Sequence, residues 1–216
     1  MNYLSVENIS KSFGARTLFE GVSFGINKDQ KIAFVAKNGT GKSTILSIIN
    51  GLDFPDTGQV VIRKGIRMEF LSQEPNLQDE LTVEESIFAS DNEILKVIER
   101  YEKALENMDD QEEYQLAFDQ MDRFNAWDFE TQYKQILFKL KLEDLKAKVK
   151  NMSGGQRKRL ALAIILINKP DLLILDEPTN HLDLEMIEWL EDYFAKENIT
   201  LFMVTHDRFF LERVCN

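Results

Sequence analysis

The chain has 216 residues, with 26 lysines and arginines against 37 aspartates and glutamates, which gives a net charge of −11 at pH 7. This length suits one domain, or a domain that carries a large insertion. The acidic balance disfavours a polyanion-binding surface as the default. No apolar run approaches the roughly 20 residues of a membrane-spanning helix. Cys215 is the only cysteine, so an internal disulfide is excluded and a reducing compartment fits best.

The N-terminal third of the sequence has the alternating pattern of β-structure. Residues 3–9, 22–26 and 32–35 are expected to be strands. After the turn residues around Pro55, segments 60–62 and 66–71 are expected to form a hairpin pair. Strands that pair locally in this way indicate an antiparallel layer beside a parallel sheet. The N-terminus has no basic start and no long apolar core, so no secretory signal is visible and a cytoplasmic location is expected.

A glycine-bearing turn lies between the strand at 32–35 and an apolar helical run at 45–49, an order that is typical of a phosphate-binding loop. Glycines let backbone N–H groups turn around a phosphate, and the helix N-terminus adds partial positive charge. Lys42 would reach the β- and γ-phosphates, and the Ser43 hydroxyl would hold Mg²⁺. Ala36 stands where the first glycine of such a loop is expected, and the small alanine should be tolerated. The predicted phosphate-binding residues are Asn38, Gly39, Thr40, Gly41, Lys42, Ser43 and Thr44.

An acidic helical region begins at Thr82, which resembles a helix N-cap followed by an acidic first turn. Apolar residues then recur at helical spacing in three stripes. The stripes are Ile87, Ile94, Ile98, Tyr101, Leu105 and Met108; Tyr114, Phe118, Met121 and Phe124; and Ile136, Leu137 and Leu140. They predict a helical hairpin that buries its own seam. Residues 84–130 contain 15 acidic against 4 basic side chains, so this region accounts for the whole net charge.

The second half returns to an α/β pattern with carboxylates at a strand end. Residues 171–175 are expected to be a buried parallel strand, because an unbroken apolar run follows Asp171, and residues 199–205 predict another strand. Asp176 would hold Mg²⁺ and Glu177 would take a proton from the attacking water. Asp183 is expected to cap a helix over residues 184–194. Ser153, Gly154, Gly155 and Gln156 begin an apolar helix, which gives a second anion site suited to another subunit's nucleotide.

Together these motifs resemble the ATP-binding cassette (ABC) family, in order along the whole chain. Residues 36–44 are similar to its Walker A loop, residues 172–177 to its Walker B motif, and residues 151–156 to its signature motif, with Met152 where leucine is usual. The resemblance identifies Gln73 with the Q-loop, Asp183 with the D-loop and His206 with the switch histidine. It also places Phe13 where the family stacks an aromatic ring on adenine.

Residues 177–183 and 205–211 look like the ABC-F subfamily, most of all the N-terminal cassette of a Uup-like member. These proteins carry two cassettes on one chain and are associated with ribosomes and translation. The 80 positions between Gln73 and Ser153 fit the inserted helical arm of that subfamily. An arm that grips RNA should be rich in lysine and arginine. Contact of this acidic arm with RNA is therefore not favoured. An acidic helical pair is most often a solvated face, and the functional alternative is an arm that contacts a protein partner or a basic surface.

The resemblance implies a two-cassette ATPase with ATP and Mg²⁺ as its ligands. The catalytic residues would be Glu177, His206 and Gln73, while Ser43, Gln73 and Asp176 would set the Mg²⁺. The signature residues Ser153 and Gly155 would reach the partner cassette's γ-phosphate. That partner is a second cassette, on the same full-length chain or in a homodimer. We expect the natural chain to continue beyond Asn216, and the isolated domain to hydrolyse ATP weakly.

The predicted fold is therefore α/β: a phosphate-loop NTPase of ABC type, with a mixed parallel sheet, an N-terminal antiparallel layer and an inserted helical subdomain. Residues 1–82 and 169–216 would form the nucleotide-binding core, and residues 83–168 the helical subdomain with the acidic arm and the signature helix. Two other functions remain open, the ATP-binding subunit of a membrane transporter and a non-catalytic nucleotide-binding scaffold. Direct insertion into a membrane is not expected.

Overall fold

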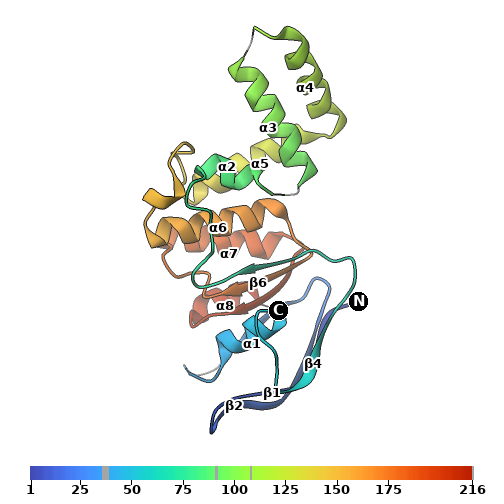
Figure 1. Ribbon diagram of the computed structural model, residues 1–216, viewed down its shortest axis with the longest axis vertical. Coiled ribbons are helices and arrows are strands. Elements are labelled where there is room, and N and C mark those ends of the chain that lie inside the picture. The colour runs from blue at the N-terminus through green and yellow to red at the C-terminus, as the bar shows by residue number, and fades with distance from the viewer. Residues whose placement is uncertain (36–38, 91, 108, 216) are drawn as a thin grey trace. The chain divides into compact units, whose positions relative to one another are not determined.

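The computed structural model describes residues 1–35, 39–90, 92–107 and 109–215. The chain divides into two compact units. Unit 1 comprises Met1–Glu74 and Lys169–Asn216, and unit 2 comprises Pro75–Asn168. Both units are traced in Figure 1. The first boundary lies eight residues before the one expected from the sequence, because residues 79–82 are hydrogen-bonded to residues 147–150 of unit 2.

Unit 1 begins with an antiparallel layer of three strands, in the order β2-β1-β4. Its strands are β1 (Asn2–Phe13), β2 (Arg16–Asn27) and β4 (Thr57–Ile62). The first two form a long hairpin that turns at Gly14 and Ala15, and Figure 1 shows it running alongside β4. Both strands extend well beyond the segments that alternation predicted. Residues 10–21, which were expected to connect two strands, are therefore mostly part of the hairpin, and its tip reaches the phosphate loop.

A parallel sheet with the order β3-β7-β6-β5 forms the second layer of unit 1. Its strands are β3 (Lys31–Phe34), β5 (Met68–Leu71), β6 (Leu172–Asp176) and β7 (Thr200–Val204). Every residue of β6 and β7 is buried, as expected for central parallel strands. The helices of this unit are α1 (Lys42–Ile49), α7 (Leu184–Lys196) and α8 (Arg208–Val214). The predicted α/β class with an antiparallel layer is confirmed.

One predicted strand pairing is wrong. Segments 60–62 and 66–71 do not form a hairpin, because β4 pairs with β1 whereas β5 pairs in parallel with β6. The backbone turns at Gly65, whose φ of +84° is readily adopted only by glycine. The apolar face of β5 is thereby used in the parallel sheet, where Phe70 lies in register with Ile174.

The two layers of unit 1 share one hydrophobic core. Helix α1 contributes Ile45, Leu46 and Ile49 to this core, all of them almost fully buried. Strand residues from both layers pack around the helix, and the ring centroids of Phe24 and Phe202 lie 5.3 Å apart in a stacked pair. Because α1 follows the phosphate loop directly, burial of its apolar face fixes the position of that loop.

Unit 2 is helical. Its elements are α2 (Val83–Phe88), α3 (Glu93–Glu106), α4 (Gln111–Arg123), α5 (Ala126–Lys139), the 3₁₀ turn η1 (Val149–Asn151) and α6 (Gly154–Asn168). The stripe that began at Ile87 was expected to lie on one helix. Instead the helix stops at Phe88 and a new one starts after Asn92, whose side chain caps it by accepting the Ile94 N–H at 3.0 Å. Leu105 is consequently exposed, while Leu95 and Val97 are buried, and Met108 lies outside the described residues.

Helices α3, α4 and α5 pack against one another around a cluster of aromatic rings. Tyr101 is at its centre, with ring centroids 6.0 Å from Tyr114, 6.5 Å from Phe118 and 5.0 Å from Trp127. Charged side chains on these helices are paired across and along them, as in the bidentate contact of Arg100 with Glu113. Of the helices that the structure describes, none is long and apolar enough to cross a membrane.

Candidate nucleotide-binding site

A cavity of about 550 Å³ lies at the carboxyl end of the parallel sheet in unit 1. This volume falls within the range of small-molecule sites. Most of the residues predicted from the sequence to bind or hydrolyse a nucleotide line it. The lining residues are Phe13, Leu18, Gly39, Gly41, Lys42, Ser43, Thr44, Gln73, Asp176, Glu177, Asn180 and His206. Residues from the first 73 positions of the chain and from its last quarter thus meet at one place.

The phosphate loop enters α1 through glycines in the left-handed region. Gly39 has φ +77° and Gly41, the N-cap of α1, has φ +90°. A Cβ on Gly41 would lie 3.0 Å from Phe19 Cδ1 and 3.2 Å from Leu18 Cβ, so the loop tolerates no side chain there without movement of its neighbours. Gly41 offers no side-chain acceptor to the start of α1, and the N–H groups at a helix N-terminus are suited to binding an anion. Asn38 lies outside the described residues.

Three polar side chains form a chain across the cavity. Lys42 is only 9% exposed, and its Nζ lies 3.1 Å from Nε2 of His206. The same Nε2 lies 3.3 Å from Oε1 of Glu177. When Nε2 carries no proton it accepts a hydrogen bond from Lys42, and when it carries one it donates to Glu177. The predicted lysine, switch histidine and catalytic carboxylate therefore lie within hydrogen-bonding reach of one another.

The carboxylates of Asp176 and Glu177 follow β6, as the sequence predicted. Asp176 is the last residue of the strand and is 5% exposed. Glu177 has φ +49°, an uncommon conformation for a residue other than glycine, held by donation from its N–H to the Val204 carbonyl at 2.8 Å. A second contact runs from the His206 N–H to Glu177 Oε2 at 3.3 Å. Strained backbone of this kind is characteristic of functional sites.

The oxygen ligands predicted for Mg²⁺ all line this cavity. Ser43 offers a hydroxyl, Gln73 an amide oxygen and Asp176 a carboxylate. Among the described residues no group of three or more histidine, cysteine, aspartate or glutamate side chains is placed to bind a metal on its own. One carboxylate with two neutral oxygens suits Mg²⁺, which keeps waters and takes substrate phosphates as further ligands. The residues present therefore fit the ion.

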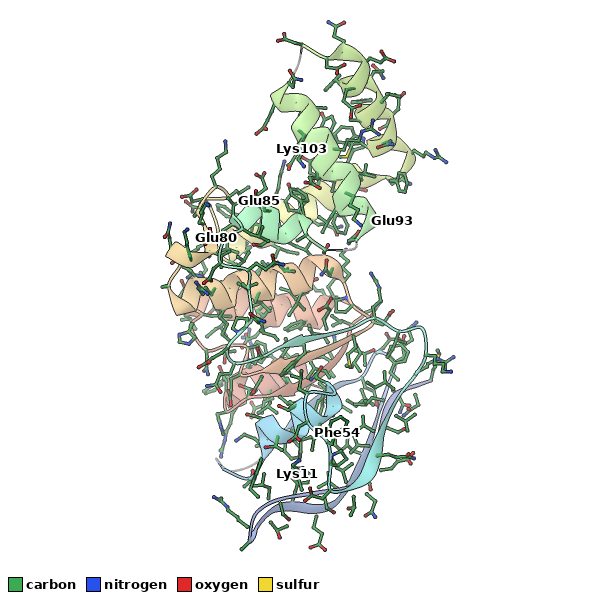
Figure 2. The ribbon with its side chains drawn as sticks, in the orientation of Figure 1. Lys11, Phe54, Glu80, Glu85, Glu93 and Lys103 are labelled. Atoms are coloured by element: carbon green, nitrogen blue, oxygen red, sulfur yellow. The ribbon has the colours of Figure 1, made fainter. Side chains whose placement is uncertain are left out.

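Phe13 lies at the end of β1, and its ring is 60% exposed at the mouth of the cavity. Lys11 lies over this ring, with Nζ 5.8 Å from the centroid. The same ammonium group bonds to Asp53 Oδ1 at 2.8 Å and to the Phe54 carbonyl at 2.6 Å. Figure 2 shows Lys11 beside Phe54. An exposed ring with a fixed neighbour is a ready stacking surface for a nucleobase.

The signature residues are not part of this cavity, since Ser153, Gly154, Gly155 and Gln156 belong to unit 2. They form a reciprocal cap at the start of α6. The Gln156 N–H donates to Ser153 Oγ at 3.3 Å, and the Ser153 N–H donates to Gln156 Oε1 at 2.8 Å. Asp183, the predicted D-loop residue, caps α7 by accepting the Met186 N–H at 3.1 Å. It too is absent from the cavity lining that the structure describes.

The sequence did not identify two residues that line the cavity, Leu18 and Asn180, nor one that contacts the phosphate loop, Arg16. Asn180 follows Glu177 by three residues, so its position after the strand could have indicated it. Leu18 and Arg16 lie on β2, which was expected to begin only near residue 22. A longer hairpin would have been predicted from the Gly14-Ala15 turn.

A family model described as "ABC transporter" matches residues 19–180 of the chain. Among curated proteins, the chain is 44% identical over its whole length to the uncharacterized ABC transporter ATP-binding protein YfmR of Bacillus subtilis and covers 36% of that protein. It is 35% identical over 97% of its length to the energy-dependent translational throttle protein EttA of Mycobacterium tuberculosis, of which it covers 39%. It is 38% identical over 97% of its length to ABC transporter F family member 2 of Arabidopsis thaliana, of which it covers 33%.

The chain therefore spans little more than a third of the length of these relatives. Among solved structures, one described as the ATP-binding subunit of an ABC transporter matches with a TM-score of 0.68 at 24% identity, over 99% of this chain and 83% of that one. A putative metal-chelate type ABC transporter in an inward-facing conformation matches with a TM-score of 0.63, also at 24% identity, over 100% of this chain and 77% of that one. These two structures share the fold.

Proposed function

Because the chain belongs to the ATP-binding cassette family and is similar to its ABC-F members, we propose that it binds Mg-ATP and hydrolyses it in a two-cassette sandwich that acts on the ribosome in translation. The observation that carries the ATPase part is the single cavity that gathers Lys42, Asp176, Glu177 and His206. The names of the relatives, a translational throttle and an F family member, support the part that concerns translation.

In this proposal the nucleotide lies along the cavity from the hairpin tip to the carboxyl ends of the strands. Phe13 stacks on the adenine ring, because it is the exposed aromatic at the cavity mouth. Lys42 and the N–H groups at the start of α1 bind the phosphates. Ser43, Gln73 and Asp176 would hold Mg²⁺, and the ion would neutralise charge on the phosphates.

Glu177 is the proposed base that takes a proton from the attacking water, and His206 is proposed to position that water. The carboxylate of Glu177 is held in place from two sides, by the His206 ring and by the His206 N–H. Proton transfer from water to Glu177 accompanies attack on the γ-phosphorus, and ADP departs with its β-phosphate oxygens stabilised by Lys42. The Lys42 ammonium carries three N–H donors, so it can bind phosphate oxygens while one N–H still reaches His206 Nε2.

The signature residues are the proposed contact with the second cassette. Ser153 and Gly155 would contact the γ-phosphate of a nucleotide bound to the partner cassette, at the N-terminus of α6. Each site would then be complete only in the sandwich. An isolated cassette is accordingly expected to bind ATP but to turn it over weakly.

A Glu177→Gln variant tests the catalytic part of the proposal. We expect ATP affinity to stay within about twofold, and phosphate release to fall about a hundredfold or more, which is the usual contribution of a general base. Glu188→Gln, an exposed carboxylate change on α7, is the matched control and should leave both unchanged. Equal phosphate release by the wild-type chain and by Glu177→Gln would overturn the assignment. Such a result would favour the scaffold alternative.

A transporter role is the alternative, supported by the relative that is named an ABC transporter ATP-binding protein. The two roles differ in the partner. The full-length protein with the Glu177→Gln change, loaded with ATP, is expected to sediment with ribosomes and to be released by ADP. Co-purification with a transmembrane subunit, and no ATP-dependent sedimentation with ribosomes, would decide for transport.

A further inference from the structure

The tip of the β1–β2 hairpin reaches the phosphate loop. Phe13 ends β1 and Arg16 begins β2, and these two residues are direct cross-strand partners around the Gly14-Ala15 turn. Arg16 donates a hydrogen bond from Nη2 to the carbonyl oxygen of Gly39 at 3.0 Å. The hairpin tip therefore presents one side chain to the mouth of the cavity and a second to the loop that forms its floor.

A second contact between β2 and the loop lies two residues further along the strand. Leu18 and Phe19 approach Gly41 so closely that even a Cβ there would meet them at 3.2 and 3.0 Å. The strand thus meets the loop at both of its described glycines, by a hydrogen bond at Gly39 and by packing at Gly41. Neither contact was anticipated from the sequence motif, which begins only after β3.

The bond from Arg16 has a geometric consequence. The carbonyl of Gly39 and the N–H of Thr40 belong to one planar trans peptide, so they point in opposite directions. A guanidinium that holds the carbonyl therefore fixes the direction of the Thr40 N–H. Glycine at φ +77° would otherwise let this peptide rotate easily, because no Cβ restricts it.

We propose that Arg16 is a positioning residue of the nucleotide site, which orients the Gly39–Thr40 peptide so that the Thr40 N–H is presented to the nucleotide's phosphates. The inference rests on the proposed function, since it requires that a nucleotide occupies this cavity. One hairpin tip would then have two roles: Phe13 stacks on the base, and Arg16 positions the loop peptide that binds the phosphates.

The number of phosphates on the ligand provides the test. With Arg16→Ala, we expect ATP and ADP to bind about tenfold more weakly, the usual scale for the loss of a hydrogen bond from a charged group. AMP and adenosine should bind as they do to the wild-type chain. Phe13→Ala should weaken all four ligands by a similar factor. Calorimetry suits the tight ligands, and ligand-observed NMR suits AMP and adenosine.

Two controls separate positioning from other roles. Arg63→Ala removes an exposed arginine of the same unit and should change no affinity. Raising the salt to about 1 M shortens the Debye length to ~3 Å, so a loss caused only by missing charge would shrink, whereas a loss caused by a misdirected peptide would persist. Arg16→Lys keeps a donor and a charge and should recover part of the ATP affinity.

Three results would overturn the inference: an unchanged ATP affinity in Arg16→Ala, an equal loss for adenosine and ATP, or a loss that vanishes at high salt. Thermal unfolding must be unchanged in Arg16→Ala, since a general loss of fold would weaken adenosine as well. If the wild-type chain itself binds neither ATP nor ADP, the proposed function fails. If it binds both and Arg16→Ala binds them equally well, only the role of Arg16 fails.

Discussion

The cavity of unit 1 and the α3–α5 bundle of unit 2 handle charge in opposite ways. The cavity places Lys42 and Asp176 in buried positions at the end of a sheet, where desolvation is costly unless each group has partners. The bundle fills its centre with aromatic rings around Tyr101 and pairs its charges around them, as Arg100 does with Glu113. The first arrangement prepares a site for a ligand, and the second stabilises a structural element.

The backbone shows the same contrast. At the cavity, Gly39, Gly41 and Glu177 adopt left-handed conformations that serve the site. In unit 2, the starts of α2 and α3 are instead satisfied by side chains, through the reciprocal cap of Thr82 and through Asn92, whereas α5 starts at Asn125 in a left-handed conformation without a side-chain cap. Changes at the cavity should therefore alter ligand affinity with little effect on stability, and changes in the bundle should do the reverse.

Truncation at the centre of the bundle gives the largest expected effect. Tyr101→Ala removes the ring that contacts Tyr114, Phe118 and Trp127, and should lower the free energy of unfolding of unit 2 by about 4 kcal/mol. Trp127 fluorescence in a Trp189→Phe background reports this transition in urea. ATP affinity should not change. Leu105→Ala, on the exposed side of the same helix, is the control and should cost under about 0.5 kcal/mol.

Loss of the buried ammonium group gives the converse result. Lys42→Ala should weaken ATP binding about a hundredfold, because charge-assisted hydrogen bonds to phosphate are lost, while the unfolding of unit 2 stays unchanged. Calorimetric titration with ATP measures it. Lys28→Ala, on an exposed turn of the same unit, should bind as the wild-type chain does. Normal ATP affinity in Lys42→Ala would contradict the claim that changes at the cavity alter ligand affinity.

The cap of α2 should matter only for stability. Thr82 Oγ1 accepts the Glu85 N–H at 3.1 Å, while the Thr82 N–H donates to Glu85 Oε2 at 2.7 Å. Thr82→Ala should therefore cost about 1 kcal/mol in the unfolding of unit 2. Thr82→Ser retains the accepting oxygen and should restore most of the loss. A drop in ATP affinity in Thr82→Ala would contradict a purely structural role.

Much of the site in unit 1 could be predicted because strand ends and glycine turns leave strong local signals. Lys42, Asp176, Glu177 and His206 are each adjacent to a buried strand or its turn, and parallel strands bring such positions to one edge. The residues that were missed, Arg16 and Leu18, reach the site through a hairpin longer than its alternation suggests. Pairing between β1 and β2 extends this hairpin to its tip, where Phe13 pairs with Arg16, and strand alternation alone does not locate that end.

The sequence predicted that the region that forms unit 2 is helical, but it did not predict where one helix ends and the next begins. Spacing placed Ile87 and Ile94 on one face, and this is satisfied equally by one long helix or by two short ones. The choice is made by Asn92, whose side chain offers a cap, and by Leu95 and Val97, which are buried in place of Leu105. The partner of β5 was misjudged for a related reason, since a short apolar strand fits either of two sheets and tertiary pairing decides.

Glu84 gives the smallest expected effect. Its carboxylate lies close to other carboxylates of unit 2, and this crowding should lower the free energy of unfolding. Partial burial, followed by the nearby carboxylates of Glu102 and Glu106, raises the pKa of Glu84 above its usual 4.5, although Lys146 acts in the opposite direction. A carboxyl group with a raised folded-state pKa binds its proton more readily when folded, so its charged form destabilises the unit at neutral pH.

Glu84→Gln should therefore increase the free energy of unfolding at pH 7, by under about 1 kcal/mol as is usual near a surface. That gain should shrink as the pH falls through the raised folded-state pKa and disappear below 4.5, where Glu84 is protonated in both states. Urea unfolding of unit 2 at several pH values measures the difference, with Glu143→Gln as an exposed control. A gain that is independent of pH would mean that shape or solvation at this position, rather than crowding of carboxylates, limits stability.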